Sequence, residues 1–308
     1  MFVYFLISVL TIVNSSFSDN GFLKSKPKPS PTPFQDWDYL VYSQRWPVTG
    51  CAQWKERSSQ NTCNLPEDAS RWTVHGVWPT KIGANGPFFC NSALHFDPDQ
   101  LTPIMKELQE DWPNIEANTK PNSFWKHEWN KHGTCASSLP LLNSVTAYFK
   151  QGLQWNQDYD LANVLKKNNI IPNMQGYNIS DIYDTVKAVM GKNPTVECVI
   201  DGKSKQSLIS EIRICFNKSL DLIDCNLTKP EGTHYRDILS NCNGKENVMY
   251  YAAVPNNTFT DVIEDMYFNE REPSIGGCLE NENYENYYFE RNLLKLYGVI
   301  KFLMWFTL

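Results

Sequence analysis

The chain has 308 residues, of which 42% are hydrophobic, 13% aromatic and 20% charged. This composition supports a sizeable folded core and excludes a coiled coil or a disordered tail as the main structure. The formal net charge of −6 at pH 7 excludes a general attraction to polyanions, so any nucleic-acid binding must take place at a locally cationic cleft.

The first residues have the pattern of an export signal. Residues 1–18 form a short apolar run that ends in Ser-Phe-Ser, which is the small-x-small pattern of a signal-peptidase site. We expect a cleaved secretory signal; an uncleaved anchor is the alternative, because no Lys or Arg precedes the apolar run. Residues 19–34 follow, with a proline at every second position from 27 to 33, and predict an extended, polyproline-like linker.

A folded domain is expected over residues 35–255, although the length alone would suffice for two domains. The segment 37–47 has apolar side chains on both of its alternating faces, which predicts a strand in the centre of a sheet. Residues 98–112 place apolar side chains at helical spacing, which predicts one amphipathic helix.

Helices and then strands follow along the chain. Two helices are predicted between Asn143 and Lys167, and a third from Ser180, as N-cap, to Gly191 at its C-terminus. The segments 195–200 and 209–216 are rich in β-branched residues and predict strands. Because helices and strands mix without a regular βαβ repeat, the predicted fold class is α+β.

Residues 256–308 are expected to form a C-terminal extension. It is acidic and rich in Asn and Tyr, and it ends in an apolar stretch, 293–308, that is interrupted by Lys295 and Lys301. This stretch is shorter and more charged than a typical transmembrane span. The alternatives are an interfacial helix, a tail anchor, a lipid-anchor signal and a segment packed on the core, so membrane contact through the tail is one of four interpretations.

The cysteines and the glycosylation motifs agree with export. Nine cysteines and no CxxC pair favour disulfides, with one cysteine left over, rather than a zinc or redox site. Sequons for N-glycosylation occur at Asn178, Asn217, Asn226 and Asn256. We therefore expect a secreted protein.

Three of the five histidines lie in two aromatic segments, RWTVHGVWPT with His75 and SFWKHEWNKHGTC with His127 and His132. If the second segment is a regular helix, at about 100° per residue, then His127, Glu128, Lys131 and His132 share one face, and the tryptophans anchor the adjacent face in the core. Such a cluster shifts the pKa values of its members in opposing directions, as acid–base catalysis requires.

The spacing argues against two common hydrolase motifs. A zinc-binding HExxH needs a second histidine four residues after His127, but Lys131 stands there and His132 lies one residue further on. The chain also lacks a GxSxG nucleophile elbow. We therefore expect no metal ion and no cofactor. RNA transesterification fits the cluster, because the ribose 2′-hydroxyl supplies the nucleophile; DNA lacks that hydroxyl and is not expected to be cleaved.

These segments resemble the two active-site signatures of the ribonuclease T2 family, with HGVWP at 75–79 and FWKHEWNKHGTC at 124–135. QRWP at 44–47, DWP at 111–113 and IRIC at 212–215 extend the resemblance across 37–255. The resemblance implies an α+β fold around an antiparallel sheet flanked by helices. It also implies a secreted or lysosomal endoribonuclease that cleaves single-stranded RNA through 2′,3′-cyclic phosphates at acid pH.

The resemblance also implies roles for individual residues. His132 would be the general base, His75 the general acid and His127 a phosphate-binding residue, while Lys131 and Glu128 would act on the phosphoryl oxygens. Trp78 would hold one base, and Gln44 and Phe124 the other. The implied disulfides are Cys51–Cys63, Cys90–Cys135, Cys198–Cys242 and Cys215–Cys225, which leaves Cys278 without a partner.

The chain departs from the family pattern after the first signature, where Thr80 stands in place of the usual acidic residue and leaves base preference open. Lys120, Lys126 and Lys131 outnumber Glu128 around the second signature, so we expect salt-sensitive RNA binding. A function of another class is also considered: a secreted glycoprotein with a noncatalytic signalling or binding role, in which the ribonuclease site is incidental.

Overall fold

The computed structural model describes residues 36–68, 70–84, 86–225, 234–235 and 238–254. The chain divides into two units, 1–31 and 32–308, and every described residue belongs to the second. The predicted signal and linker, the C-terminal extension, Cys278 and the sequons at Asn226 and Asn256 lie outside the described residues. Among the residues that are described, no helix is both long and apolar enough to cross a bilayer.

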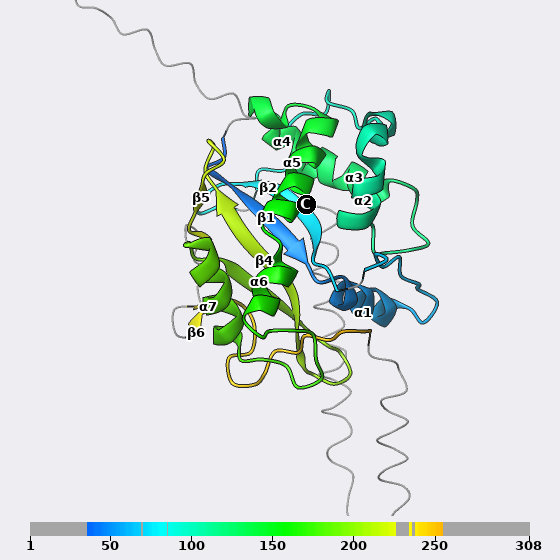
Figure 1. Ribbon diagram of the computed structural model, residues 1–308. Helices are drawn as coiled ribbons and strands as arrows, with labels where there is room; N and C mark the ends of the chain where they lie inside the picture. Colours follow the sequence, from blue (N-terminus) through cyan, green and yellow to red (C-terminus); the bar gives the residue numbers. More distant parts are fainter. Residues whose placement is uncertain (1–35, 69, 85, 226–233, 236–237, 255–308) are drawn as a thin grey trace, which may run out of the picture. The chain divides into compact units, whose positions relative to one another are not determined.

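The fold is α+β and is built around an antiparallel sheet (Figure 1). Its strands are β1 (Tyr39–Arg45), β2 (Thr73–Thr80), β3 (Thr195–Ile200), β4 (Ser207–Phe216) and the short β5 (Leu222–Ile223). The order is β2-β1-β4-β3, with β5 paired to β4, and each pairing is antiparallel. A separate two-stranded sheet joins β6 (His234–Tyr235) to β7 (Ile238–Leu239).

Strand β1 lies between β2 and β4, which confirms the central strand predicted for the segment 37–47. Its alternating side chains enter two hydrophobic clusters: Tyr39 belongs to one cluster, and Leu40 and Tyr42 belong to the other. Both faces of β1 are therefore covered, as the apolar residues on both faces of its sequence indicated.

The helices surround this sheet. They are α1 (Pro47–Arg57), η2 (Pro98–Ile104), α2 (Met105–Asp111), α3 (Ser123–Glu128), η3 (Trp129–Gly133), α4 (Thr134–Ala136), η4 (Pro140–Leu142), α5 (Val145–Asp158), α6 (Leu161–Lys167) and α7 (Ile179–Met190). In Figure 1, α5 crosses the sheet and continues into α6. Trp155 of α5 stacks on Phe216 of β4 with ring centroids 4.0 Å apart, which fixes α5 against the sheet.

The segment 98–112 differs from the single helix that its periodicity predicts. It contains a 3-10 helix, η2, followed by the α-helix α2. Pro103 lies inside η2 and has no amide hydrogen to donate, which disfavours a continuous α-helical ladder through this point. The predicted apolar positions Leu101, Ile104 and Leu108 are nevertheless buried.

The later elements are close to their predicted positions. Helices α5 and α6 confirm the two helices expected between Asn143 and Lys167, and β3 and β4 confirm the two strands, with β4 beginning at Ser207. The predicted N-cap is wrong: Asn178, not Ser180, caps α7, because its Oδ1 accepts a 2.9 Å hydrogen bond from the backbone N–H of Ser180. Gly191 ends the helix in the left-handed conformation, as predicted.

Four disulfides form within the described residues, with the pairing that the family resemblance implies. They are Cys51–Cys63, Cys90–Cys135, Cys198–Cys242 and Cys215–Cys225. The Cys90–Cys135 bond joins the loop after β2 to α4. It thereby connects the chain segments that carry the two histidine-containing signatures.

Candidate active site

Strand β2 and the α3–η3 segment bring two imidazoles to one indole. The His75 ring meets the Trp78 ring edge-on with centroids 5.1 Å apart, and the His132 ring lies 5.5 Å from the same indole. His75 and Trp78 come from β2, whereas His132 comes from η3. Two histidines that are far apart in the sequence are therefore neighbours of a single aromatic ring.

The segment after α3 is a π-helical turn rather than the regular α-helix assumed from the sequence. The backbone N–H of Thr134 donates to the carbonyl of Trp129, five residues earlier. Such a turn brings residues five apart, as His127 and His132 are, toward the same side of the helix, and π-turns occur frequently at functional sites. Gly133 permits the turn, because a Cβ at this position would overlap the Trp129 ring.

The tryptophans of this segment anchor it in the core, as predicted. Trp125 and Trp129 are buried in the same cluster as Trp112. The indole N–H of Trp125 donates to the Trp112 carbonyl at 2.8 Å, and the indole N–H of Trp112 donates to the His75 carbonyl at 3.1 Å. This chain of hydrogen bonds connects α3 to the backbone of β2.

Lys131 lies beside an aromatic loop that follows β2. Its ammonium group lies 4.8 Å from the centroid of the Phe88 ring, and Phe88 also meets the His132 ring edge-on at 5.7 Å. The next residue, Phe89, has a left-handed backbone with φ of 52°, and its N–H donates to the Lys131 carbonyl at 3.0 Å. That bond and the neighbouring Cys90–Cys135 disulfide hold the loop against η3.

Glu128 is buried with 1% of its surface exposed, and one of its oxygens accepts a hydrogen bond from the Trp78 indole at 3.0 Å. Burial raises the pKa of Glu128, although the charges of His75 and Lys131 and the Trp78 hydrogen bond partly oppose this. The carboxyl group therefore lies behind the indole, in contact with the base-binding candidate Trp78.

Burial shifts the equilibria of the other ionisable groups of the cluster toward their neutral forms. Burial, with the charges of Lys131 and His75, lowers the pKa of His127 to about 4. Burial also lowers the pKa of His132 well below its ordinary value, and Lys131 and His127 add to this effect. Burial lowers the pKa of Lys131 as well, against the charge of Glu128. An anion that entered the cluster would favour the protonated forms of all three cations.

His75 has a partner that the sequence reasoning missed. Its Nδ1 lies 2.6 Å from Oε1 of Glu211, on β4, although β1 separates β2 from β4. Burial would raise the pKa of Glu211, but the charges of Arg213 and His75 outweigh it and hold this pKa well below its usual range. The available signal was an acid and a base, Glu211 and Arg213, in an otherwise largely apolar strand.

The structure separates the predicted base-binding residues. Trp78 is partly exposed, and Phe124 stacks on His75 with centroids 6.0 Å apart and carries the Arg45 guanidinium 4.7 Å from its own centroid. Gln44 is 1% exposed, and its side-chain nitrogen donates to the Tyr159 carbonyl at 2.7 Å. Gln44 is therefore not brought to the cluster, because it lies on the same face of β1 as Leu40 and Tyr42, which are buried in a hydrophobic cluster.

Thr80 turns its side chain back onto the backbone of its own strand. Its hydroxyl group donates to the carbonyl of Trp78 at 3.0 Å, within the same strand. A hydroxyl group turned onto its own backbone is a weak replacement for a carboxylate that could accept hydrogen bonds from a base.

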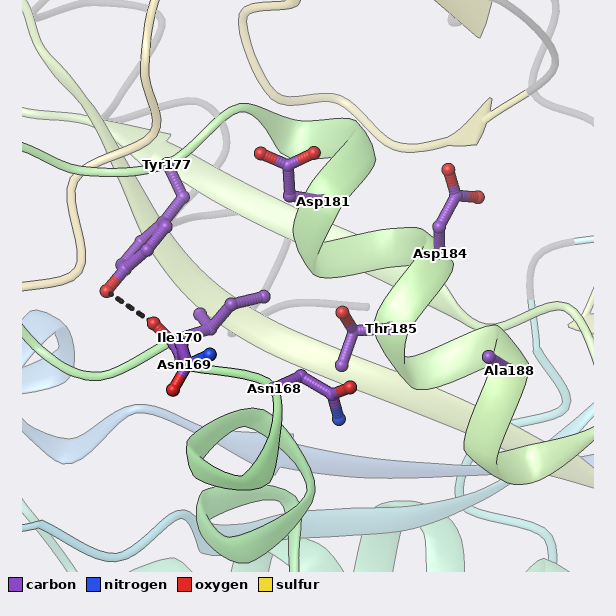
Figure 2. A pocket seen from close by; sticks show the side chains of 8 residues that line it. All are labelled: Asn168, Asn169, Ile170, Tyr177, Asp181, Asp184, Thr185 and Ala188. Atoms are coloured by element: carbon purple, nitrogen blue, oxygen red, sulfur yellow. Dashed lines mark hydrogen bonds between the residues drawn. The ribbon is translucent and has the colours of Figure 1, made fainter.

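The described residues form a groove and a pocket at the surface. A groove of about 410 Å³ borders the cluster and is lined in part by Lys120, Asn122, Phe124 and Trp125. Figure 2 shows a pocket of about 500 Å³ elsewhere, at α7, where Tyr177 donates a hydrogen bond to the Asn169 carbonyl. None of the clustered histidines lines either hollow, but the groove includes Phe124, whose ring stacks on that of His75.

Comparison with known proteins identifies the family. Residues 37–225, more than half of the chain, match the model of the ribonuclease T2 family. The chain belongs to the ribonuclease T2 family. As a T2-type ribonuclease it is an endoribonuclease whose substrate is single-stranded RNA.

Relatives and solved structures agree with this assignment. Ribonuclease Oy of Magallana gigas is 37% identical over 226 residues, which cover 72% of this chain and all of the relative. Ribonuclease T2 of Homo sapiens is 34% identical over 198 residues, covering 63% of this chain and 72% of the relative. The crystal structure of human RNase T2 matches with a TM-score of 0.57 and 31% identity over 70% of this chain and 99% of that one. The structure of RNase NT in complex with 5′-AMP matches this T2-type ribonuclease with a TM-score of 0.58 and 26% identity, with the same coverage.

Proposed function

We propose that this endoribonuclease works without a metal ion, by transesterification that leaves 2′,3′-cyclic phosphate ends, and that it works best at acid pH. The observation that carries the proposal is that the rings of His75 and His132 both neighbour the Trp78 indole, with centroids 5.1 and 5.5 Å from it. Two imidazoles beside one indole, a ring of about the size of a nucleobase, can serve as acid and base on a single phosphodiester.

In this mechanism His132 removes the proton from the ribose 2′-hydroxyl group, and the oxygen attacks the adjacent phosphorus. His75 donates a proton to the departing 5′-oxygen. Because burial lowers the pKa of His132, this base remains neutral in mildly acidic solution. A lower pH favours the protonated form that a general acid needs, so a neutral base and a protonated acid can be present together in acid solution.

The cationic side chains act on the phosphate. Lys131 and His127 stand on the same side of the helical segment as His132, and electrostatic interactions among these residues are strong enough to shift their pKa values. Negative charge that develops on the phosphoryl oxygens in the transition state would be stabilised by these donors. Glu128 acts from behind Trp78, where it orients the indole and balances the positive charge.

The test uses a DNA oligonucleotide that contains a single ribonucleotide. The protein is incubated with it in EDTA between about pH 4 and pH 8, and the fragment ends are analysed by mass spectrometry. We expect one cut, after the ribose, that leaves a 2′,3′-cyclic phosphate and a 5′-hydroxyl group, with the highest rate at acid pH. The all-DNA oligonucleotide is the control. Loss of cleavage in EDTA, or fragments with 3′-hydroxyl ends, would overturn the proposal.

We also propose that the protein is exported. Four disulfides suit an oxidising compartment, and a relative that is 30% identical over 196 residues is named Extracellular ribonuclease LE, from Solanum lycopersicum. Expression in cultured animal cells should place the protein in the medium or in lysosomes, with a mobility that shifts on enzymatic removal of N-glycans. Cytosolic protein with reduced thiols would contradict this.

The C-terminal stretch 293–308 is tested in the same cells. If this stretch contacts membranes, the full-length protein sediments with them and a chain that ends at residue 292 does not. Equal distribution of the two proteins between membrane and soluble fractions would remove this role.

A further inference from the structure

Glu211 lies outside both active-site signatures but contacts His75 directly. We propose that Glu211 is a positioning residue, which holds His75 in the tautomer and orientation that direct its Nε2 toward the reacting phosphorus. This inference rests on the proposed role of His75 as general acid. It concerns how that histidine is held, and it is tested below with a measurement that does not depend on activity.

The backbone around His75 is arranged to make this contact possible. In the pairing of β1 with β2, Ser43 faces Gly76 and Gln44 faces Val74, so His75 is the extra residue of a β-bulge and has no partner in the ladder. Bulges redirect side chains and are frequent next to active sites. Here the bulge accompanies a His75 side chain that reaches past β1 to β4, while its carbonyl accepts the hydrogen bond from Trp112.

The two oxygens of Glu211 are divided between different partners. Oε2 accepts hydrogen bonds from the Ser43 hydroxyl at 2.9 Å and from Nε and Nη2 of Arg213 at 2.9 and 2.7 Å. Oε1 is left for His75, 2.6 Å away. Because Oε2 is held by Ser43 and Arg213, the carboxylate plane is fixed, and with it the direction from which it meets the imidazole.

An ionised carboxylate can only accept hydrogen bonds, so the imidazole nitrogen that it contacts must carry a hydrogen. The positive charge of Arg213 keeps Glu211 ionised. Nδ1 of His75 is therefore the protonated nitrogen in the neutral ring, and Nε2 is the nitrogen that gains and loses the transferred proton. In hydrolytic triads, too, a carboxylate binds Nδ1–H of the histidine and orients the ring, while Nε2 transfers the proton.

The second carboxylate near His75 does not compete for this role. Glu128 interacts electrostatically with His75, but its carboxylate accepts a hydrogen bond from the Trp78 indole. His127 and His132 of the α3–η3 segment also interact electrostatically with His75, and neither can supply a carboxylate. Among the described residues, Glu211 is thus the carboxylate that hydrogen-bonds the ring.

The chain offers a matched control for Glu211. Glu197 on β3 is the direct register partner of Glu211 on β4, and it also binds Arg213, at 3.2 Å. The substitutions Glu211→Gln and Glu197→Gln therefore remove one negative charge each from the same arginine, by the same isosteric change. They differ in that Glu211 also contacts His75 and accepts a hydrogen bond from Ser43.

Kinetics on a dinucleotide substrate test the first consequence. We expect Glu211→Gln to lower kcat about 10- to 100-fold, the usual cost of losing an orienting partner, with KM changed by less than about twofold. Glu197→Gln should keep kcat within about twofold of the unaltered protein. Equal losses of kcat in the two variants would show that the negative charge beside Arg213 matters and the contact with His75 does not. That result would overturn the inference.

Nitrogen NMR of protein labelled with ¹⁵N-histidine tests the second consequence. In the unaltered protein and in Glu197→Gln, neutral His75 should be the Nδ1–H tautomer, whereas Glu211→Gln should give a mixture, because an amide can donate as well as accept. An unchanged tautomer in Glu211→Gln would overturn the inference. If that variant does not fold, Glu211→Asp keeps the charge but shortens the reach, and should also lose kcat and the single tautomer.

The two proposals fail in different ways. If His75→Ala cleaves RNA at the normal rate, the proposed role of His75 as general acid is wrong, even where NMR shows the tautomer to depend on Glu211. If His75→Ala is inactive but Glu211→Gln is fully active with its tautomer unchanged, the catalytic proposal stands and the positioning role is wrong.

Discussion

The indole nitrogen of Trp78 donates a 3.0 Å hydrogen bond to the buried carboxyl group of Glu128. This bond joins β2 to α3 and gives a partner to a group that would be costly to bury alone. Gly76 leaves the space in which the two side chains meet, because a Cβ at this position would overlap both the indole nitrogen and the carboxyl oxygen. The glycine of the first signature is therefore a packing requirement of the site.

Substitution of this glycine tests that requirement. We expect Gly76→Ala to lower the free energy of unfolding by about 1–3 kcal/mol, as overpacking does, and to lower kcat at least about tenfold because Trp78 and Glu128 must move. Urea denaturation and initial rates on RNA measure the two effects. The control is Gly50→Ala in α1, where a Cβ would meet Ile115 at an ordinary 3.8 Å.

In the control variant the expected change in the free energy of unfolding has the opposite sign. Alanine is favoured over glycine within a helix by about 0.5–1 kcal/mol, so Gly50→Ala should be slightly more stable and fully active. A Gly76→Ala protein that matched it in both stability and rate would show that the Trp78–Glu128 contact is unimportant.

Two disulfides should differ in their effect on catalysis. Replacing Cys90 and Cys135 by Ser opens a loop with a sequence separation of 45, and replacing Cys51 and Cys63 opens one of 12. Each change should cost about 2–5 kcal/mol of stability. Only loss of Cys90–Cys135 should also lower kcat, about tenfold, because this bond holds the Phe88 loop against Lys131. Thermal denaturation and rates on RNA at a temperature where both variants are folded check this; equal kcat values would refute it.

The stability of the fold should depend on pH through His127. Its pKa is about 4 in the folded protein against an ordinary value of 6.5, so between these values the unfolded chain binds more protons and stability falls as the pH falls. Allowing for solvent screening, we expect a loss of about 1–2 kcal/mol across this window. Unfolding by urea at several pH values should give a shallower dependence for His127→Gln, and identical slopes would contradict the prediction.

RNA binding should depend on salt through exposed lysines near the groove. Lys120 and Lys126 are both exposed beside the α3 segment. Their replacement by Ala should raise KM. It should also make the slope of log binding constant against log salt concentration shallower by about 0.7 for each lysine that contacts a phosphate. Lys166→Ala with Lys167→Ala, at the end of α6, removes the same charge elsewhere and serves as control. A similar change in both double variants would indicate a general charge effect.

The sequence predicted the elements whose signals are local. The signals for β1 and for the buried Trp125 and Trp129 each lie within a short stretch of sequence. The structure confirms the central strand and the buried indoles. The N-cap of α7 was misplaced because Asn178 and Ser180 are both good caps and stand two residues apart. The break in the helix at Pro103 was likewise overlooked in favour of an apolar period.

The contacts that the sequence could not predict are non-local or break a regular geometry. Glu211 meets His75 only after β2, β1 and β4 have paired in register and a bulge has turned the histidine. The π-turn departs from the constant rotation per residue that a helical wheel assumes. The position of Gln44 in its strand does not reveal that its side chain is buried and donates to the Tyr159 carbonyl.

Trp112 determines how the two signatures are placed relative to each other. Its indole holds the backbone of β2 at His75, and its own carbonyl is held by the indole of Trp125 in α3. The spacing between the signatures in space therefore does not depend on the length of chain that links them. Insertions or deletions in the intervening loops should therefore leave the geometry of the candidate site intact, so these loops could change the surface that the RNA meets while the cluster keeps its arrangement.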